Sequence, residues 1–178
     1  MTSQKKIGKA IAHPNIAFIK YWGNRDDELR LAANDSISMN LGTLETRTTV
    51  EFFQTGVLEQ DELSINGKSM HGSSLERVSR FIDIARKQAK IDLPARVTST
   101  TNFPMGAGIA SSAAAFAALA MAVSEAAGLS YTTQSLSRYA RRGSGSASRS
   151  IPAGFVEWQA GDSDETSYAV SCAEPSHW

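Results

Sequence analysis

Residues 95–128 read ARVTSTTNFPMGAGIASSAAAFAALAMAVSEAAG, and this stretch decides the fold of the chain. Its first part, Ala95 to Thr101, is interpreted as a strand that leads into the loop Asn102 to Ala110. The alanine-rich sequence that follows predicts a helix from about Ser111 to Ala127, which Gly128 ends as the C′ residue. A strand, a glycine-containing loop and a helix therefore follow one another directly.

The loop has the features of an anion site. Gly106 and Gly108 have no Cβ, so the backbone can turn sharply there and come close to a ligand. The start of the following helix offers unpaired N–H groups and the positive end of its dipole, and the hydroxyls of Ser111 and Ser112 can donate to phosphate oxygens or ligate Mg²⁺. The alternative is an ordinary loop with a serine N-cap. Spacing alone does not decide, because neither the Walker pattern nor G-x-G-x-x-G is matched.

Strands are predicted before this unit. The loosely alternating segment Lys6 to Lys20 indicates a strand or a pair of strands, and Thr46 to Phe53 is rich in β-branched and aromatic residues, as strands are. Asn66-Gly67 supplies the positive φ angles of a type I′ turn between Leu63–Ile65 and Lys68–Met70, which predicts a hairpin.

Two further helices are predicted. Ser73 and Glu76 have the spacing of a capping box, ahead of a helix from about Ser74 to Lys90. A threonine at 132 or 133 can cap a shorter helix that runs through Arg142. Strands precede helices more often than they alternate with them, so the expected fold class is α+β.

The bulk composition limits the possible functions. Of the 178 residues, 42% are hydrophobic and 20% are charged, and 18 basic residues balance 18 acidic ones. A zero net charge argues against nucleic-acid binding, so any anion site must be local. Cys172 stands alone, no secretory signal is recognised at the N-terminus, and no stretch is apolar enough for a membrane span. We therefore expect a cytoplasmic protein that binds neither nucleic acid nor membranes.

Three motifs carry a family resemblance. Pro104 to Ala114 resembles the central motif of the GHMP kinase superfamily, in which this loop wraps the phosphates of ATP. Ala12 to Arg25 (AHPNIAFIKYWGNR), continued by Asn34 to Ser38, resembles the N-terminal motif of the diphosphomevalonate decarboxylases. Arg141 to Ser150 (RRGSGSASRS), followed by Gly154 to Trp158, resembles their most specific signature. The chain therefore resembles the front half of an ATP-dependent mevalonate-phosphate decarboxylase.

The resemblance implies an architecture and an activity. The fold would be the α+β N-terminal domain of the GHMP kinases, a two-layer sheet-and-helix fold similar to a ribosomal-protein domain. Residues 1–178 would form one ATP- and substrate-binding domain, without the C-terminal domain of the family. The implied reaction phosphorylates the tertiary hydroxyl of a 5-phosphorylated mevalonate with ATP. Phosphate and CO₂ are then lost together, which leaves an isopentenyl phosphate in the mevalonate pathway of isoprenoid biosynthesis.

Site residues follow from the same motifs. Arg149 matches the arginine that holds the substrate carboxylate, and Ser144 and Ser146 match serines that line the substrate phosphate and hydroxyl region. Tyr21 matches a tyrosine that hydrogen-bonds the phosphate end, with Lys20 beside it. Arg149 and Ser144 are the expected catalytic residues of this half.

The resemblance also implies the cofactors. The residues expected around the ATP phosphates are Pro104, Gly106, Ala107, Gly108, Ala110, Ser111 and Ser112. Mg²⁺ would arrive on ATP. No protein metal ligand is expected, because His13 has no partner at metal spacing.

One position departs from the family pattern. The family motif I-K-Y-W-G-K ends in lysine, and Asn24 stands there in this chain. A neutral contact in place of a cationic one favours a substrate tail with one phosphate, 5-phosphomevalonate, over diphosphomevalonate. Arg25 could restore the charge, so both substrates stay open.

A segment like residues 174–178 lies about midway along family members, whose second half supplies the aspartate assigned as catalytic base. We therefore expect this chain alone to bind ATP weakly, to turn nothing over and to expose an apolar surface that the second half normally covers. A homodimer is expected for the full-length form. The alternatives are a GHMP kinase that phosphorylates mevalonate without decarboxylation, or a truncated non-catalytic binding domain, for which RNA binding is conceivable but disfavoured by the charge.

Overall fold

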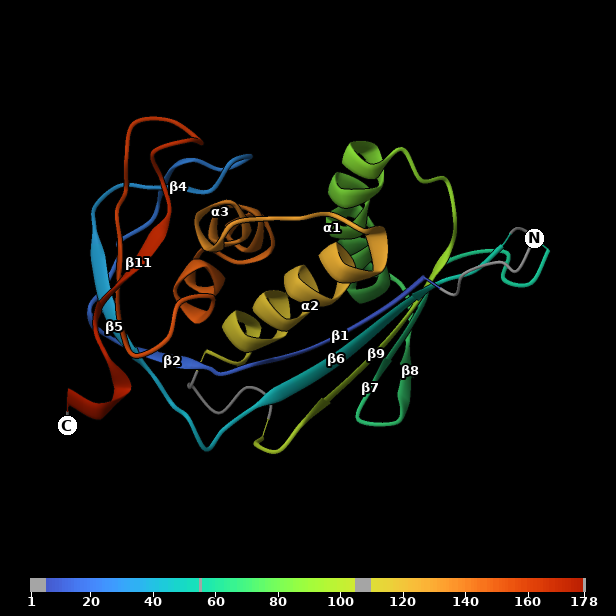
Figure 1. Cartoon of the computed structure of the whole chain (residues 1–178), viewed down its shortest axis with the longest axis horizontal. Helices are drawn as coiled ribbons and strands as arrows, with labels where there is room; N and C mark the ends of the chain where they lie inside the picture. The colour runs from blue at the N-terminus through green and yellow to red at the C-terminus, as the bar shows by residue number, and fades with distance from the viewer. Residues whose placement is uncertain (1–5, 55, 105–109, 178) are drawn as a thin grey trace.

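The computed structural model of the chain describes residues 6–54, 56–104 and 110–177. Two sheets enclose a layer of helices, with the N-terminus beyond one end of the larger sheet and the C-terminus beside the smaller sheet (Figure 1). The mixed α+β class predicted from the sequence is confirmed. The smaller sheet was not predicted, and it adds a further layer to the expected pair of layers.

The larger sheet has five strands, in the order β1 (Lys6–Ala12), β6 (Thr46–Phe52), β9 (Ala95–Thr101), β7 (Glu62–Ile65) and β8 (Lys68–Met70). Neighbouring strands are antiparallel except β7 and β9, which are parallel. Every second residue of β6 is buried, as expected for a sheet covered on one face.

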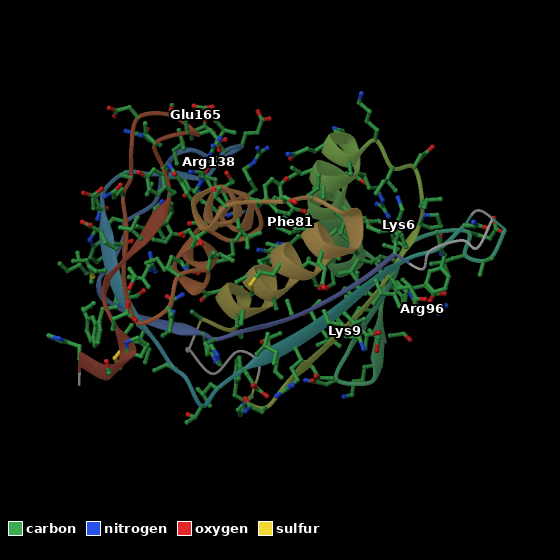
Figure 2. The ribbon with its side chains drawn as sticks, viewed as in Figure 1. Lys6, Lys9, Phe81, Arg96, Arg138 and Glu165 are labelled. Atoms are coloured by element: carbon green, nitrogen blue, oxygen red, sulfur yellow. The ribbon has the colours of Figure 1, made fainter. Side chains whose placement is uncertain are left out.

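The hairpin between β7 and β8 is confirmed in detail. Asn66 and Gly67 have φ angles of 50° and 76°, which are the two positive values that a type I′ turn needs. Lys9 and Arg96 belong to this sheet and have exposed side chains, whereas Phe81 lies on the helical side (Figure 2).

Helix α2 (Ser111–Ala127) lies along β1 and β6. Its small alanine side chains let it approach the sheet closely. At Gly8 on β1 a Cβ atom would lie only 2.0 Å from the carbonyl oxygen of Ala122. The predicted helix and its end at Gly128, where φ is 70°, are confirmed. The residue before the helix is Ala110, in the left-handed conformation, so no serine side chain caps this N-terminus.

Helices α1 (Ser73–Ala89) and α3 (Thr133–Gly143) pack beside α2. Thr132 caps α3 by accepting from the amide of Ser135 at 3.1 Å. The capping box predicted for α1 is wrong. Gly72, with φ of 60°, occupies the N-cap position, and its carbonyl accepts from the amide of Glu76 at 2.9 Å. Ser73 is therefore already helical and cannot act as the cap.

The smaller sheet has the order β11 (Ala169–Ala173), β10 (Phe155–Trp158), β5 (Ser36–Asn40) and β2 (Asn15–Ile19). The strand pair predicted at 6–20 exists as β1 and β2, but these strands belong to different sheets. Strands β5 and β11 were missed because β5 buries serines rather than apolar side chains, and β11 is largely exposed.

Short elements complete the chain. A two-stranded ribbon joins β3 (Asn24–Asp26) and β4 (Leu31–Ala32), and a short helical turn, η2 (Pro175–His177), follows β11. The Gly/Ser-rich run after α3 is a largely buried 3₁₀ helix, η1 (Gly145–Ser150). None of the helices described for the chain is long and apolar enough to cross a membrane.

Candidate active site

The candidate site surrounds η1, which packs against α2, α3 and the smaller sheet. Glycines let η1 fit into this narrow space. At Gly145 a Cβ atom would lie 2.9 Å from the hydroxyl oxygen of Tyr21 and 3.1 Å from the ring of Trp158. The Gly/Ser composition therefore serves close packing here, and it brings Tyr21 beside η1.

Arg149 is the central residue of the site. It is only 3% exposed, and its guanidinium contacts neutral oxygens alone. Nε donates to Ser38 Oγ at 3.0 Å and Nη1 to Ser36 Oγ at 2.5 Å. Nη2 donates to Asn15 Oδ1 at 3.4 Å. A guanidinium carries five N–H donors, so one donor on each terminal nitrogen is left for another acceptor.

Arg149 is buried without a counter-ion, which distinguishes it from Arg141. Among the described residues two arginines are buried, and Arg141, at 0% exposed, pairs with the carboxylate of Asp164. Asp164 also pairs with Arg138, which lies near Glu165 at the same end of the molecule (Figure 2). No carboxylate of the described residues pairs with Arg149. Burial lowers the pKa of Arg149 from its ordinary value to about 10, although the nearby Tyr21 raises it.

Two aromatic rings flank the Arg149 guanidinium. Its central carbon lies 6.0 Å from the ring centroid of Tyr21 and 5.8 Å from that of Trp158. The two rings meet edge to face at 4.9 Å. Ring faces attract a cation weakly without neutralising it. The arrangement therefore holds a positive charge in place and leaves it available to an anion.

A row of serine hydroxyls links this arginine region to the start of α2. Ser112 Oγ lies 3.3 Å from Ser144 Oγ, which lies 3.4 Å from Ser146 Oγ. Ser112 is exposed and Ser146 is partly exposed, and Ser144 between them is only 8% exposed. Such hydroxyls can donate to the oxygens of an anionic ligand or accept from its hydroxyl.

A cavity of about 210 Å³ adjoins the start of α2. It lies between the larger sheet, α1 and α2, with Leu63, Val97 and Phe116 on its apolar walls. Ser99, Ser111 and Ser112 supply hydroxyls to the same cavity. An apolar chamber with a few hydroxyls next to a helix N-terminus can hold a flat polar ring attached to phosphates.

The structure brings together several residues that the sequence singled out. Tyr21, Ser112, Ser144, Ser146 and Arg149 form one connected region. Pro104 is exposed, and Ala110 and Ser111 begin α2. Gly106, Ala107 and Gly108 lie outside the described residues.

Lys20 and Asn24 form hydrogen bonds outside the region around Arg149. The exposed Lys20 donates to the carbonyl of Ala17 at 3.2 Å, and Asn24 donates to Asp27 at 3.1 Å. Arg25 pairs with the exposed Asp162 at 3.3 Å. Their predicted contacts with a substrate tail stay predictions.

Four residues around Arg149 were assigned no role from the sequence. Asn15, Ser36 and Ser38 accept its hydrogen bonds, and Trp158 lies beside it. The signal was present for Ser36 and Ser38, because they alternate with larger apolar residues along β5 and so share its buried face. For Asn15 no local pattern shows that its side chain turns inward.

The described part of the chain holds no group of three or more His, Cys, Asp or Glu side chains that could bind a metal. His13 Nδ1 donates to the carbonyl oxygen of Leu44 at 2.8 Å. A carbonyl oxygen only accepts, so His13 Nδ1 carries the proton.

The fold and the site together define a class of protein. It is an α+β domain in which a buried arginine without a carboxylate partner and a row of serine hydroxyls lie near the start of a helix. A family described as the diphosphomevalonate decarboxylase-like N-terminal domain matches residues 12–169. The chain belongs to this family, as its motifs indicated.

Curated decarboxylases are similar in sequence to this chain. Diphosphomevalonate decarboxylase of Aspergillus fumigatus is 40% identical over 194 residues, which cover 99% of this chain and 48% of the relative. Phosphomevalonate decarboxylase of Haloferax volcanii is 40% identical over 155 residues, 87% of this chain and 47% of the relative. The chain thus spans about half the length of the curated relatives it matches.

Solved structures agree with the computed fold. The crystal structure of mevalonate diphosphate decarboxylase from Staphylococcus aureus superimposes with a TM-score of 0.90 at 49% identity, covering 96% of this chain and 51% of that one. A second solved structure, of MDDEF in complex with MVAPP, AMPPCP and magnesium, superimposes on this chain with a TM-score of 0.89. It is 44% identical in sequence, over 96% of this chain and 51% of that one.

Proposed function

We propose that this chain is the ATP- and substrate-binding half of a decarboxylase that converts a 5-phosphorylated mevalonate to an isopentenyl phosphate. The observation that carries the proposal is Arg149, a buried guanidinium with no carboxylate partner among the described residues. Removing a charge from water is costly unless an opposite charge meets it. A substrate carboxylate would supply that charge.

The geometry of Arg149 suits a carboxylate in particular. Ser36, Ser38 and Asn15 each take one N–H, so one N–H remains on each of the two terminal nitrogens. Two parallel donors match the two oxygens of a carboxylate. Arg149 would therefore hold the carboxyl group that leaves as CO₂, and Ser144 and Ser146 would contact the neighbouring hydroxyl and phosphate.

The start of α2 and the adjoining cavity support ATP binding. Ser111 and Ser112 stand at the helix N-terminus, where no side chain of the described residues caps the helix. Bound ATP would supply the phosphoryl group that makes the substrate hydroxyl a leaving group, with Mg²⁺ on its phosphates. The chain's own part is to hold the phosphates with amides and hydroxyls and to direct the substrate hydroxyl toward them.

Two proposals remain for the substrate, which would carry either one phosphate or two. The relatives include both diphosphomevalonate and phosphomevalonate decarboxylases. Asn24 in place of the motif's lysine favours the monophosphate, whereas the exposed Arg25, which pairs with Asp162 at 3.3 Å, could restore the charge. The ratio of kcat/KM for the two substrates decides the question, and a clear preference for the diphosphate would end the monophosphate proposal.

A second half, like that of the relatives, would complete the site with its aspartate. Exposed apolar side chains support the proposal that a second half covers this surface. Phe18, Ile19 and Trp22, in and after β2, are 56%, 54% and 85% exposed. Exposed apolar surface of this kind is typical of contact sites. We propose that this surface meets the second half, and that the completed protein forms a homodimer.

The activity test uses a fusion of this chain with the second half of the Staphylococcus aureus relative. The proposal predicts ATP-dependent CO₂ release from the fusion, none from the chain alone, and loss in an Arg149→Lys fusion that still melts cooperatively. ADP formation without CO₂ would instead identify a kinase. A folded fusion that forms neither product would overturn the proposed function.

A further inference from the structure

The side chain of Arg77 on α1 reaches the end of α3. Its Nη2 donates to the carbonyl oxygen of Gly143 at 2.8 Å, and its guanidinium carbon lies 4.5 Å from the ring centroid of Phe116. Partial burial lowers the pKa of Arg77, and the nearby cation of Arg30 lowers it further. Within the described ranges no carboxylate forms an ion pair with Arg77, so its contacts are with a carbonyl and a ring.

The Phe116 ring fits tightly against Gly143. A Cβ atom on Gly143 would lie 2.1 Å from Phe116 Cδ1, so the ring packs directly on the glycine backbone. Phe116 meets Phe81 edge to face at 5.2 Å, and Phe81 stacks on Tyr139 at 4.4 Å. Arg77 thus sits at the end of an aromatic cluster that joins α1, α2 and α3.

Gly143 is the last residue of α3, and Ser144 follows it directly. The last carbonyls of a helix lack partners within the helix. Here arginine side chains take two of them: Arg77 bonds Gly143, and Arg30 bonds the carbonyl of Arg142 at 3.2 Å. The amide of Ser144 makes only a long bond of 3.3 Å to Ala140, so α3 itself holds Ser144 weakly.

We propose that Arg77 is a positioning residue for Ser144. It clamps the end of α3 against Phe116 of α2, and this places the Ser144 hydroxyl beside Ser112. The role of Ser144 toward substrate rests on the proposed function, whereas the clamp itself does not. A planar guanidinium is needed because it must bond a carbonyl and lie on a ring at once, and a lysine ammonium does not reproduce both contacts.

A direct role at the nucleotide is the competing explanation. Arg77 is exposed and lines the same cavity as Ser111 and Ser112, so it could instead touch a phosphate. The two roles differ in the ligand that they affect. A positioning role acts on substrate through Ser144, and a phosphate contact acts on the nucleotide and depends on charge.

The test compares Arg77→Met and Arg77→Lys with Arg80→Met in the full 178-residue chain. Arg80 is the matched control because it is exposed like Arg77, lies on the same helix and, among the described residues, bonds the carbonyl of Glu76 within that helix. Amide exchange by NMR reports on residues 143–147. Titrations with 5-diphosphomevalonate and with Mg-AMPPCP report on the two ligands separately.

Both Arg77 variants are expected to speed amide exchange at 144–147 by about tenfold or more. They should weaken 5-diphosphomevalonate binding by about 10- to 100-fold, and Mg-AMPPCP binding should change by less than about threefold. Arg80→Met should match the wild type in all three. Unchanged exchange would overturn the clamp, and a selective loss of Mg-AMPPCP binding that Arg77→Lys restores would show a phosphate contact instead. If the wild-type chain binds neither ligand, amide exchange alone decides on Arg77, and CO₂ release by the fusion decides separately on the proposed function.

Discussion

Asn15 fixes the direction of Arg149 without neutralising it. The amide oxygen of Asn15 accepts from Nη2 of Arg149 at 3.4 Å, while its amide nitrogen donates to Ser150 Oγ at 2.8 Å and to the carbonyl of Ser146 at 3.0 Å. Asn15 is 3% exposed. A neutral side chain that bonds both ends of η1 therefore orients the buried cation, and its charge remains for a ligand.

Replacing this neutral partner with a charged one tests that argument. In Asn15→Asp a carboxylate would stand beside Arg149 and compete with a substrate carboxylate. We expect the affinity for 5-diphosphomevalonate to fall at least about tenfold, the equivalent of about 1.4 kcal/mol, with Mg-AMPPCP affinity unchanged as the internal control. Calorimetric titration of both ligands measures this. Wild-type affinity for the substrate in Asn15→Asp would contradict a carboxylate role for Arg149.

The pKa of Arg149 predicts a pH dependence of stability. Because burial lowers its pKa to about 10 in the folded chain, below the ordinary value for arginine, the unfolded chain holds this proton more tightly. The buried charge thus costs stability below about pH 10, and this cost is progressively relieved as the pH rises above that value. Relative to Arg149→Met, the wild type should gain about 1 kcal/mol by about pH 10.5.

Urea unfolding of both proteins between about pH 8 and pH 10.5 measures this difference in the free energy of unfolding. Comparing the two proteins cancels the titration of the lysines and tyrosines that lie away from Arg149. A difference that stays flat, or that moves against the wild type, would show that the Arg149 charge is already compensated in the folded chain.

Asp61 provides a test of fold stability away from the site. It accepts from Arg86 and from the amide of Ala95, the latter at 2.8 Å. Burial raises its pKa, but hydrogen bonds from Arg86, Ala95 and Ser79 outweigh this, so the pKa lies below its ordinary 3.8. Asp61→Asn should cost about 1–3 kcal/mol at neutral pH.

The sign follows from the lowered pKa: the carboxylate stabilises the fold above its ordinary pKa of 3.8, and this stability is lost as pH falls below that value. The gap between wild type and Asp61→Asn should therefore narrow in acid. Glu62→Gln is the matched control, because the Glu62–Arg96 pair has side chains that are 49% and 45% exposed, and it should cost no more than about 1 kcal/mol. Equal losses in the two variants would refute the prediction.

Gly143 is predicted to tolerate no side chain. Gly143→Ala would place a Cβ 2.1 Å from Phe116 Cδ1, so the ring or the end of α3 must move. We expect a loss of about 1–3 kcal/mol. Gly42→Ala is the control, because nothing lies within 4 Å of a Cβ there and its φ is not positive. Thermal unfolding of both variants makes the comparison, and a Gly143→Ala variant as stable as the control would contradict the packing described here.

Local patterns were enough to predict most of the larger sheet and all three long helices. Asn66-Gly67, Gly128 and the β-branched run at 46–52 each act through their own backbone, so their structure can be read from a few neighbours. Strand β5 of the smaller sheet escaped prediction because its buried face carries Ser36 and Ser38, whose polarity makes sense only once Arg149 lies against them. Such a pairing joins residues more than 100 positions apart, which no local period reveals.

The sequence predicted only part of the site, because some of the site's contacts depend on the tertiary fold. Arg149, Ser144 and Tyr21 were found because they stand in motifs, and the structure places them in one region. The motifs contain Asn15 without showing its use, since its contacts with Arg149 and Ser150 depend on the tertiary fold. The capping box failed because the sequence does not show that Gly72 takes the N-cap position before Ser73.

The position of a bound substrate carboxylate tests the central claim most directly. A crystal structure of this chain with 5-diphosphomevalonate and Mg-AMPPCP should show both carboxylate oxygens bonded to the two terminal nitrogens of Arg149, with the Ser144 hydroxyl alongside. A carboxylate bound elsewhere, with Arg149 still contacting only Ser36, Ser38 and Asn15, would contradict the account.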